Sequence, residues 1–105
     1  MVLGAVAGFD WDHGNREKCQ KHGVPIAVIE GLFDRPIAVF PDPEHSTAEK
    51  RFKAIGRTGD GRGVLIVFTL RSKSGAEFIR PVSARYMHLK EVVFVEEAIA
   101  RTENR

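Results

Sequence analysis

The sequence of 105 residues contains one cysteine, Cys19, so no disulfide can form within the chain. Such sparse use of cysteine is typical of a reducing compartment, and we expect a cytoplasmic protein. No hydrophobic run approaches the roughly 20 residues that a membrane helix requires, so we expect no membrane partner. The length fits one domain over residues 1–105 with a single modest core.

The first eight residues, MVLGAVAG, are apolar but too short to form a membrane anchor. They lack the basic region and the cleavage site of a signal peptide. We therefore expect residues 1–8 to form a flexible N-terminal extension of the domain.

The chain also lacks the residue patterns that mark metal sites and covalent catalysis. The spacing of its histidines, relative to one another and to Cys19, does not match a ligand set: His13, His22, His45 and His88. We therefore predict no metal and no other cofactor. No Gly-x-Ser-x-Gly motif or Cys/His arrangement points to acyl transfer.

The chain also has almost no excess of charge of one sign, since its net charge is only +2. Its charged residues are, however, unevenly distributed along the sequence. Residues 50–90 hold ten lysines and arginines against two acidic residues, a net charge of +8, between acidic ends. A basic block of this kind is suited to binding a polyanion on one surface. The alternative is a solvated strand surface whose lysines and arginines protect exposed edges.

The first part of the chain predicts a short strand and two helices. The strand covers residues 9–11, and Asp12 is a good N-cap for a helix over about residues 13–21. Gly23 is the residue type that ends helices in the left-handed conformation. Pro25 fits the first position of a second helix, which carries an apolar stripe.

After Pro36 the pattern becomes strand-like, and a helix follows from about residue 88 to 102. Pro81 interrupts the hydrogen-bonding ladder of the last strand, so we expect it at an edge or a bulge. The order predicts an α+β fold, with a short strand and two helices, then a four-stranded antiparallel meander and a C-terminal helix. The expected strands of the meander are residues 37–40, 51–58, 64–70 and 77–84.

Three ordered segments match a known family: FDWDHGNREKCQKHGV from residue 9, RFKAIGRT from residue 51 and RPVSAR from residue 80. In these segments, and over about residues 9–96, the chain resembles the BrnT family of type II toxin–antitoxin ribonuclease toxins. The resemblance implies a RelE-like fold and an endoribonuclease that cleaves mRNA. It also implies a ribbon-helix-helix antitoxin as partner, and a possible homodimer or toxin–antitoxin heterotetramer.

RNA carries its own nucleophile, the 2′-hydroxyl, so its cleavage needs neither a metal nor a covalent intermediate. We assign the proton transfer to Lys21 or His22, with Glu30 as a reserve general base. Without any function, Lys21 and His22 would also be explained as cations that interact with the dipole of the first helix. The guanidinium groups that we expect to converge on one phosphate are Arg57, Arg80 and Arg85.

The direction of Arg80 is open at this point. It alternates with Phe78 and Val82, so a regular strand would turn it toward the core, whereas a bulge at Pro81 would redirect it. Each arginine taken alone is also explained as a structural surface cation.

Four further residues are candidates around the RNA. Trp11 either packs in the core with Phe9 or stacks on a base at the rim of the site. Strand alternation predicts that Lys53 is exposed, and we expect Lys50, Lys53 and Arg62 to contact RNA.

The closing helix is more apolar than one buried face requires, which favours a second contact surface. We expect its partner interface at Val93, Phe94 and Ile99. Members of the family often carry a tyrosine just before a glutamate in this helix, whereas this chain has Val95 before Glu96.

That difference leaves an alternative function open. The chain would then be a catalytically inactive binding module that acts with a DNA-binding antitoxin in operon autoregulation. A purely structural protein is a third interpretation, but it explains neither the basic block nor the three matching segments.

Overall fold

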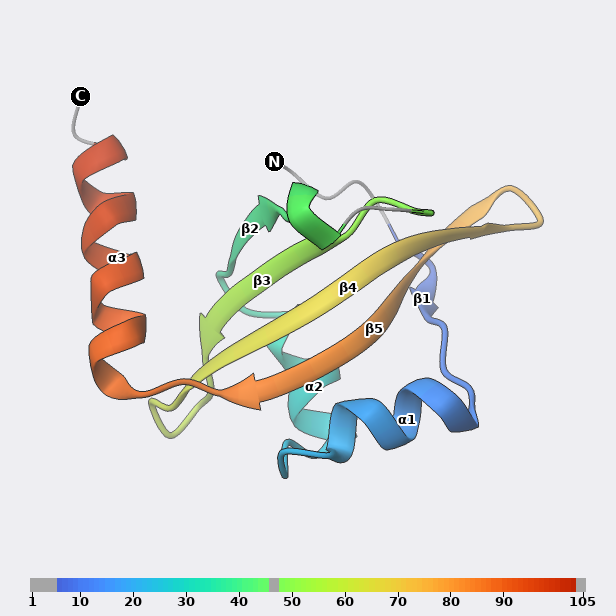
Figure 1. Ribbon diagram of the computed structural model, residues 1–105, viewed down its shortest axis with the longest axis horizontal. Helices are drawn as coiled ribbons and strands as arrows, with labels where there is room; N and C mark the ends of the chain where they lie inside the picture. The colour runs from blue at the N-terminus through green and yellow to red at the C-terminus, as the bar shows by residue number, and fades with distance from the viewer. Residues whose placement is uncertain (1–5, 46–47, 104–105) are drawn as a thin grey trace.

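The computed structural model describes residues 6–45 and 48–103. They form a five-stranded sheet in the order β1-β5-β4-β3-β2, with three α-helices and a short 3-10 helix, η1 (Figure 1). The strands are β1 (Gly8–Phe9), β2 (Ala38–Pro41), β3 (Phe52–Arg57), β4 (Gly63–Lys73) and β5 (Ala76–Tyr86). The helices are α1 (His13–Gln20), α2 (Ile26–Leu32), η1 (Pro43–His45) and α3 (Leu89–Glu103).

The predicted α+β order is confirmed, because β2 to β5 form a four-stranded antiparallel meander between the first two helices and α3. The short first strand pairs in parallel with β5. It begins and ends earlier than expected, since Trp11 lies beyond it. Gly8 belongs to β1 and the N–H of Ala7 donates to the carbonyl of Glu77 at 2.7 Å, so the sheet holds two residues of the expected extension. Residues 1–5 lie outside the described part of the chain.

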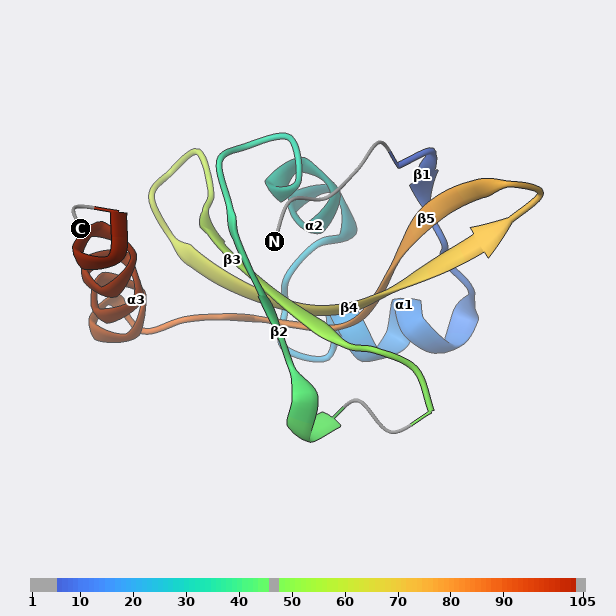
Figure 2. The same ribbon diagram turned by 90° about the horizontal axis from the view of Figure 1, so that it is seen from above.

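The two faces of the sheet differ in what covers them. The inner face packs under α2, as seen from the edge in Figure 2. It carries the core, in which Ala54, Ile66 and Phe68 are fully buried and Phe33 of the α2 end packs edge-on against Phe68. Alternation places the other side chains of β3, β4 and β5 on the opposite face, here called the outer face.

Helix α1 packs against β5 and runs beside it in the same direction (Figure 1). Asp12 caps the helix as predicted, in a reciprocal pair of hydrogen bonds with Asn15. The Asn15 amide also donates to the carbonyls of Asp10 and Pro81 at 2.9 Å each, which fixes α1 to β5. Gly23 has a φ of +80°, the left-handed conformation expected at the helix end. Cys19 is fully buried, and burial raises the pKa of its thiol to about 11.

A β-bulge divides β5. Val67 pairs with Ser83 and Phe68 pairs with Pro81, so Val82 has no partner position in β4. The bulge predicted at Pro81 is therefore confirmed, and its physical reason is that proline has no N–H to donate to the ladder.

Helix α3 stands at the end of the sheet where β4 begins and β5 ends (Figure 1). Its buried residue Val92 packs on Gly63, where a Cβ atom would lie only 2.8 Å from the Val92 Cβ. Leu89 and Phe94 are each 67% exposed. No helix in the described part of the chain is both long and apolar enough to cross a membrane.

Candidate functional site

Cations gather on the outer face of the sheet. Strand register places six lysines and arginines of β3, β4 and β5 there, and Arg51 extends the same row just before β3. The predicted exposure of alternate residues in β3 is confirmed, since Ala54 is buried on the inner face while Lys53 is partly exposed. The seven cations of the outer face are Arg51, Lys53, Arg57, Arg71, Lys73, Arg80 and Arg85.

The bulge brings Arg80 and Arg85 to the same face. Residues five apart would point to opposite faces of a regular strand. Because Val82 is an extra residue, Arg80 lies opposite Thr69 and Arg85 lies opposite Leu65, both on the outer face. The sequence left the direction of Arg80 open between a regular strand and a bulge at Pro81, and the bulge is not what turns it outward. Arg80 faces outward without it, because Ile79 rather than Phe78 enters the core, and the bulge redirects Arg85 instead.

The three predicted arginines share a face but do not meet at one point, which corrects the expected convergence. Arg85 and Arg57 lie beside neighbouring positions of β4, opposite Leu65 and Gly63 respectively. Arg80 lies four positions further along β4, which corresponds to about 13 Å. The three guanidinium groups bind three different carboxylates, of Glu96, Asp12 and Glu91, and so do not surround one common point.

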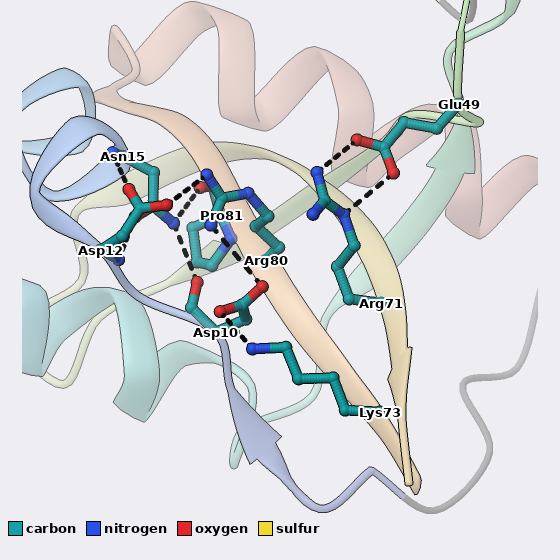
Figure 3. A network of polar contacts seen from close by, with 8 residues as sticks. All are labelled: Asp10, Asp12, Asn15, Glu49, Arg71, Lys73, Arg80 and Pro81. Carbon is teal, nitrogen blue, oxygen red and sulfur yellow. Dashed lines mark hydrogen bonds and ion pairs between the residues drawn. The ribbon is translucent and has the colours of Figure 1, made fainter. Parts of the chain in front are cut away.

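Arg80 is held where β1 meets α1. Its Nη2 donates to Asp12 Oδ2 at 2.9 Å, and its Nη1 lies 3.5 Å from Asp10 Oδ2. Lys73 Nζ donates to the other oxygen of Asp10 at 2.9 Å. These contacts lower the carboxyl pKa values: that of Asp10 chiefly through Lys73, and that of Asp12 through the Asn15 backbone and then Arg80. Figure 3 shows how Arg80 and Lys73 reach these carboxylates from the strands.

Arg71 extends from β4 beside Arg80 and binds Glu49, in the segment that leads into β3, through two parallel hydrogen bonds of 2.8 and 3.0 Å (Figure 3). The hydrogen bonds from Arg71 lower the pKa of Glu49, so this carboxylate is ionised at neutral pH. A planar guanidinium holds a phosphate in the same two-pronged way.

Helix α3 binds the other two arginines. Arg57 donates to both carboxylate oxygens of Glu96 at 2.7 Å, and Arg85 donates to both oxygens of Glu91 at 3.0 and 3.1 Å. Glu91 also accepts the backbone N–H of His88 at 2.9 Å. Arg85 and then His88 lower the pKa of Glu91 to about 2. Two predicted phosphate ligands are thus already paired with carboxylates.

The predicted proton-transfer residues are not grouped together. Lys21 and His22 are exposed just past α1, which in Figure 1 ends toward the same end of β5 as Arg85. Glu30, the reserve base, is on α2 and accepts a hydrogen bond from the Trp11 indole at 2.9 Å. Both Trp11 and Phe9 pack against the core, as one of the two interpretations predicted. Through its hydrogen bond to Glu30, the Trp11 indole is tied to α2, the helix that covers the inner face.

The remaining predicted residues surround the sheet. Lys50 is exposed just before β3, and Arg62, in the β3–β4 loop, lies 3.5 Å from the centre of the Tyr86 ring. Lys53 lines an apolar groove of about 600 Å³ between α3 and the β2–β3 edge. Of the predicted partner residues, Phe94 and Ile99 line the same groove, whereas Val93 does not.

A second hollow, of about 240 Å³, lies between α1 and the outer face. Four cations and one carboxylate line it: Lys18, Arg51, Arg71, Arg80 and Glu49. Sequence reasoning missed all of these except Arg80. The available signal was that Lys18 and Arg51 belong to two of the three matching segments, while nothing in the sequence marks Arg71 or Glu49. No three histidine, cysteine, aspartate or glutamate side chains group as metal ligands within residues 6–45 and 48–103.

Comparison with known proteins decides the family. The family model described as the ribonuclease toxin BrnT of a type II toxin–antitoxin system matches residues 11–91. The chain belongs to the BrnT family. A search of curated proteins gives no match. The BrnT match covers β4 and β5, the two strands that line the hollow, and it ends at the third residue of α3. The α3 residues that line the apolar groove therefore come after the matched segment.

Family membership makes the chain a ribonuclease toxin of a type II toxin–antitoxin system. A BrnT toxin acts on RNA and is paired with a protein antitoxin. The outer face carries seven cations from three strands and the segment before β3, a distribution of charge that suits a polyanion such as RNA.

Proposed function

We propose that the chain is an endoribonuclease that cleaves mRNA on the outer face without a metal, inhibiting translation in the cytoplasm. The observation that carries the proposal is the bulge at Val82, which places Arg80 and Arg85 on one basic face about 13 Å apart. Two arginines at that separation contact different backbone phosphates of one RNA strand. The RNA then runs along β5, between α1 and the rest of the outer face.

Cleavage begins when the 2′-oxygen attacks the adjacent phosphorus. A base takes the 2′-hydroxyl proton, and an acid gives a proton to the departing 5′-oxygen. The products are a 2′,3′-cyclic phosphate and a 5′-hydroxyl, and no electrons are exchanged with a cofactor. The extra charge on the phosphorane is the quantity that fixed guanidinium groups stabilise.

We assign the charge stabilisation at the scissile phosphate to either Arg80 or Arg85, with the other arginine and Arg57 as further phosphate contacts, and the proton transfers to Lys21 and His22. Lys21 follows Lys18 by three residues, so both project from one side of α1. Lys18 lines the hollow that Arg80 also lines, which supports Lys21 as its neighbour along the RNA path. The imidazole of His22 can accept a proton at one nitrogen and donate one from the other, as acid–base catalysis requires.

The test is incubation of the purified chain with RNA in EDTA. We expect cleavage with cyclic-phosphate or 3′-phosphate ends. We expect that Arg80→Ala and Arg85→Ala each lower the rate by about 10²-fold. A requirement for magnesium or 3′-hydroxyl products would refute the mechanism, and full activity in the double variant would refute the residue assignment.

The carboxylate pairing of Arg57, Arg80 and Arg85 supports a second candidate. With these arginines occupied, the chain would be an inactive binding module that works with a DNA-binding antitoxin in operon autoregulation. The same experiment distinguishes the two functions, because an inactive module binds its antitoxin but leaves RNA intact in every condition.

We further propose that the antitoxin is a ribbon-helix-helix protein that docks in the apolar groove between α3 and the β2–β3 edge. The exposed ring of Phe94 and the side chains of Ile55 and Ile99 line the groove, and Lys53 stands at its rim. A segment with an apolar stripe and acidic flanks matches this lining and continues onto the basic outer face. Dimerisation of such an antitoxin would bring two toxin chains into a heterotetramer.

A further inference from the structure

The hollow between α1 and the outer face contains an excess of positive charge. Lys18, Arg51, Arg71 and Arg80 line it, against the single carboxylate of Glu49. Asp12 and Asp10 reach Arg80 from the α1 side. Asn15 also lines the hollow, but its amide nitrogen is fully used by the carbonyls of Asp10 and Pro81.

A buried hydroxyl lies next to two of these arginines in the sheet. Thr69 is on the outer face, directly opposite Arg80 and two residues before Arg71, and it is only 1% exposed. Its Oγ1 has no hydrogen-bond partner within residues 6–45 and 48–103. A buried hydroxyl without a partner has lost its hydrogen bonds to water and has gained none in the protein, which costs free energy. A ligand that hydrogen-bonds to the hydroxyl would remove this cost.

We propose that Thr69, Arg71 and Arg80 form a binding site for one phosphodiester group of the RNA. The assignment rests on the ribonuclease function proposed above. The Thr69 hydroxyl donates to one of the two non-bridging oxygens, and the guanidinium groups of Arg71 and Arg80 donate to this pair of oxygens as well. Lys18 and Arg51 add long-range attraction at the entrance.

In the free protein, Glu49 and Asp12 occupy the positions of the phosphate oxygens. Glu49 makes two parallel hydrogen bonds to Arg71, the geometry in which a phosphate would bind it. Binding therefore exchanges carboxylates for a phosphate, and the side chains above Thr69 must move to admit it. Both arginines are held in extended positions beforehand, which reduces the conformational entropy lost on binding.

The decisive variant is Thr69→Val, which replaces the hydroxyl by a methyl of nearly the same size. If the hydroxyl is unsatisfied in the free chain, we expect the melting temperature to stay equal or rise. Affinity should nevertheless fall by about 10-fold or more, because a hydrogen bond to a charged group is lost. The matched control is Thr102→Val on α3, whose hydroxyl donates to the Ala98 carbonyl. We expect this control to leave affinity unchanged.

Binding is measured on an RNA of mixed sequence with 2′-O-methyl groups throughout, which cannot be cleaved. Arg71→Gln should weaken this binding by about 10-fold, whereas Arg101→Gln, the same change of charge on α3, should leave it almost unaltered. In parallel, inorganic phosphate is titrated into the labelled wild-type chain, with sodium chloride at equal ionic strength. We expect a saturable NMR shift of the Thr69 methyl with phosphate only.

A fall in melting temperature for Thr69→Val would mean that the hydroxyl already has a partner, and would overturn the site. Equal RNA affinity of wild type and Thr69→Val would also overturn it, even if free phosphate shifts the Thr69 methyl. If Thr69→Val does not fold, unchanged affinity in Arg71→Gln is the overturning result. Failure of RNA cleavage with the Thr69 shift intact would count against the proposed function and not against the site.

Discussion

At the scale of single residues, carboxylates already hold most cations of the outer face, namely Arg57, Arg71, Lys73, Arg80 and Arg85. The carboxylates come from segments outside the three strands that carry the cations: Asp10, Asp12, Glu49, Glu91 and Glu96. Each of these pairs is at least partly exposed, so none is expected to add much to stability. Their main effect is to fix the direction of the guanidinium and ammonium groups before RNA arrives.

Among the carboxylates of these pairs, Glu91 is the one whose pKa is lowered most. Its folded-state pKa is about 2, against an ordinary value of 4.5. A lowered carboxyl pKa stabilises the folded state above pH 4.5, and this contribution is lost as the pH falls toward about 2. We expect NMR of the side-chain carboxyl carbon to show a midpoint near 2, and Arg85→Gln to move it upward. An unmoved midpoint in that variant would show that the His88 N–H alone sets the pKa.

At the scale of elements, the position of α3 depends on one glycine. Gly63 lets Val92 approach so closely that an alanine Cβ would lie 2.8 Å from the Val92 Cβ and 3.0 to 3.1 Å from its methyls. Because these atoms are branched and buried, the helix must shift to admit the methyl group, at a cost of about 1–3 kcal/mol.

We therefore expect Gly63→Ala to expose the α3 amides to hydrogen exchange while the β4 amides stay protected. Gly31→Ala is the matched control, because a Cβ there meets nothing within 4 Å and alanine favours the helix. Since Glu91 and Glu96 move with α3, Gly63→Ala should also free Arg57 and Arg85 and tighten RNA binding. Unchanged exchange in α3 would show that the helix accommodates the methyl in place.

The sequence predicted the order of strands and helices better than it predicted the face of the sheet to which each side chain points. Strand and helix order follow from local periodicity, and Asp12, Gly23 and Pro81 each mark a local conformation that the structure confirms. The direction of Arg80 stayed open in the sequence because it depends on which of Phe78 and Ile79 enters the core, and packing across the sheet decides that. Glu49 and Arg71 are 22 residues apart, and no local pattern links them.

At the scale of the whole molecule, the outer face makes a testable electrostatic surface. Each RNA phosphate that the face neutralises releases counterions, so the logarithm of affinity should fall linearly with the logarithm of salt concentration, by about 0.7 per phosphate for a single strand. Lys50→Glu with Lys53→Glu should reduce that slope by ~1.4 if each lysine contacts one phosphate. Lys90→Glu with Arg101→Glu makes the same change in net charge on α3 and should alter the slope less. Equal slopes in the two double variants would assign the effect to net charge alone.

The antitoxin surface is tested by two equally exposed residues of one helix. Phe94 lines the groove between α3 and the β2–β3 edge, whereas Leu89 does not, and both are 67% exposed. Phe94→Asp should preserve folding and abolish neutralisation by the antitoxin, measured as residual RNA cleavage in the mixture. Leu89→Asp should leave neutralisation intact. Unfolding of Phe94→Asp would place this ring in the core and refute the docking surface.

The alkylation rate of Cys19 allows the opening of the fold to be compared among all these variants. The thiol is fully buried and has a pKa of about 11, so an alkylating reagent meets almost no thiolate until the chain opens. Because it is the sole cysteine of the sequence, mass spectrometry will resolve one label and one rate. The ratio of that rate to the rate in denaturant measures how often α1 leaves β5. This labelling rate distinguishes a variant that has lost only a contact with its ligand from a variant whose folded structure opens more often.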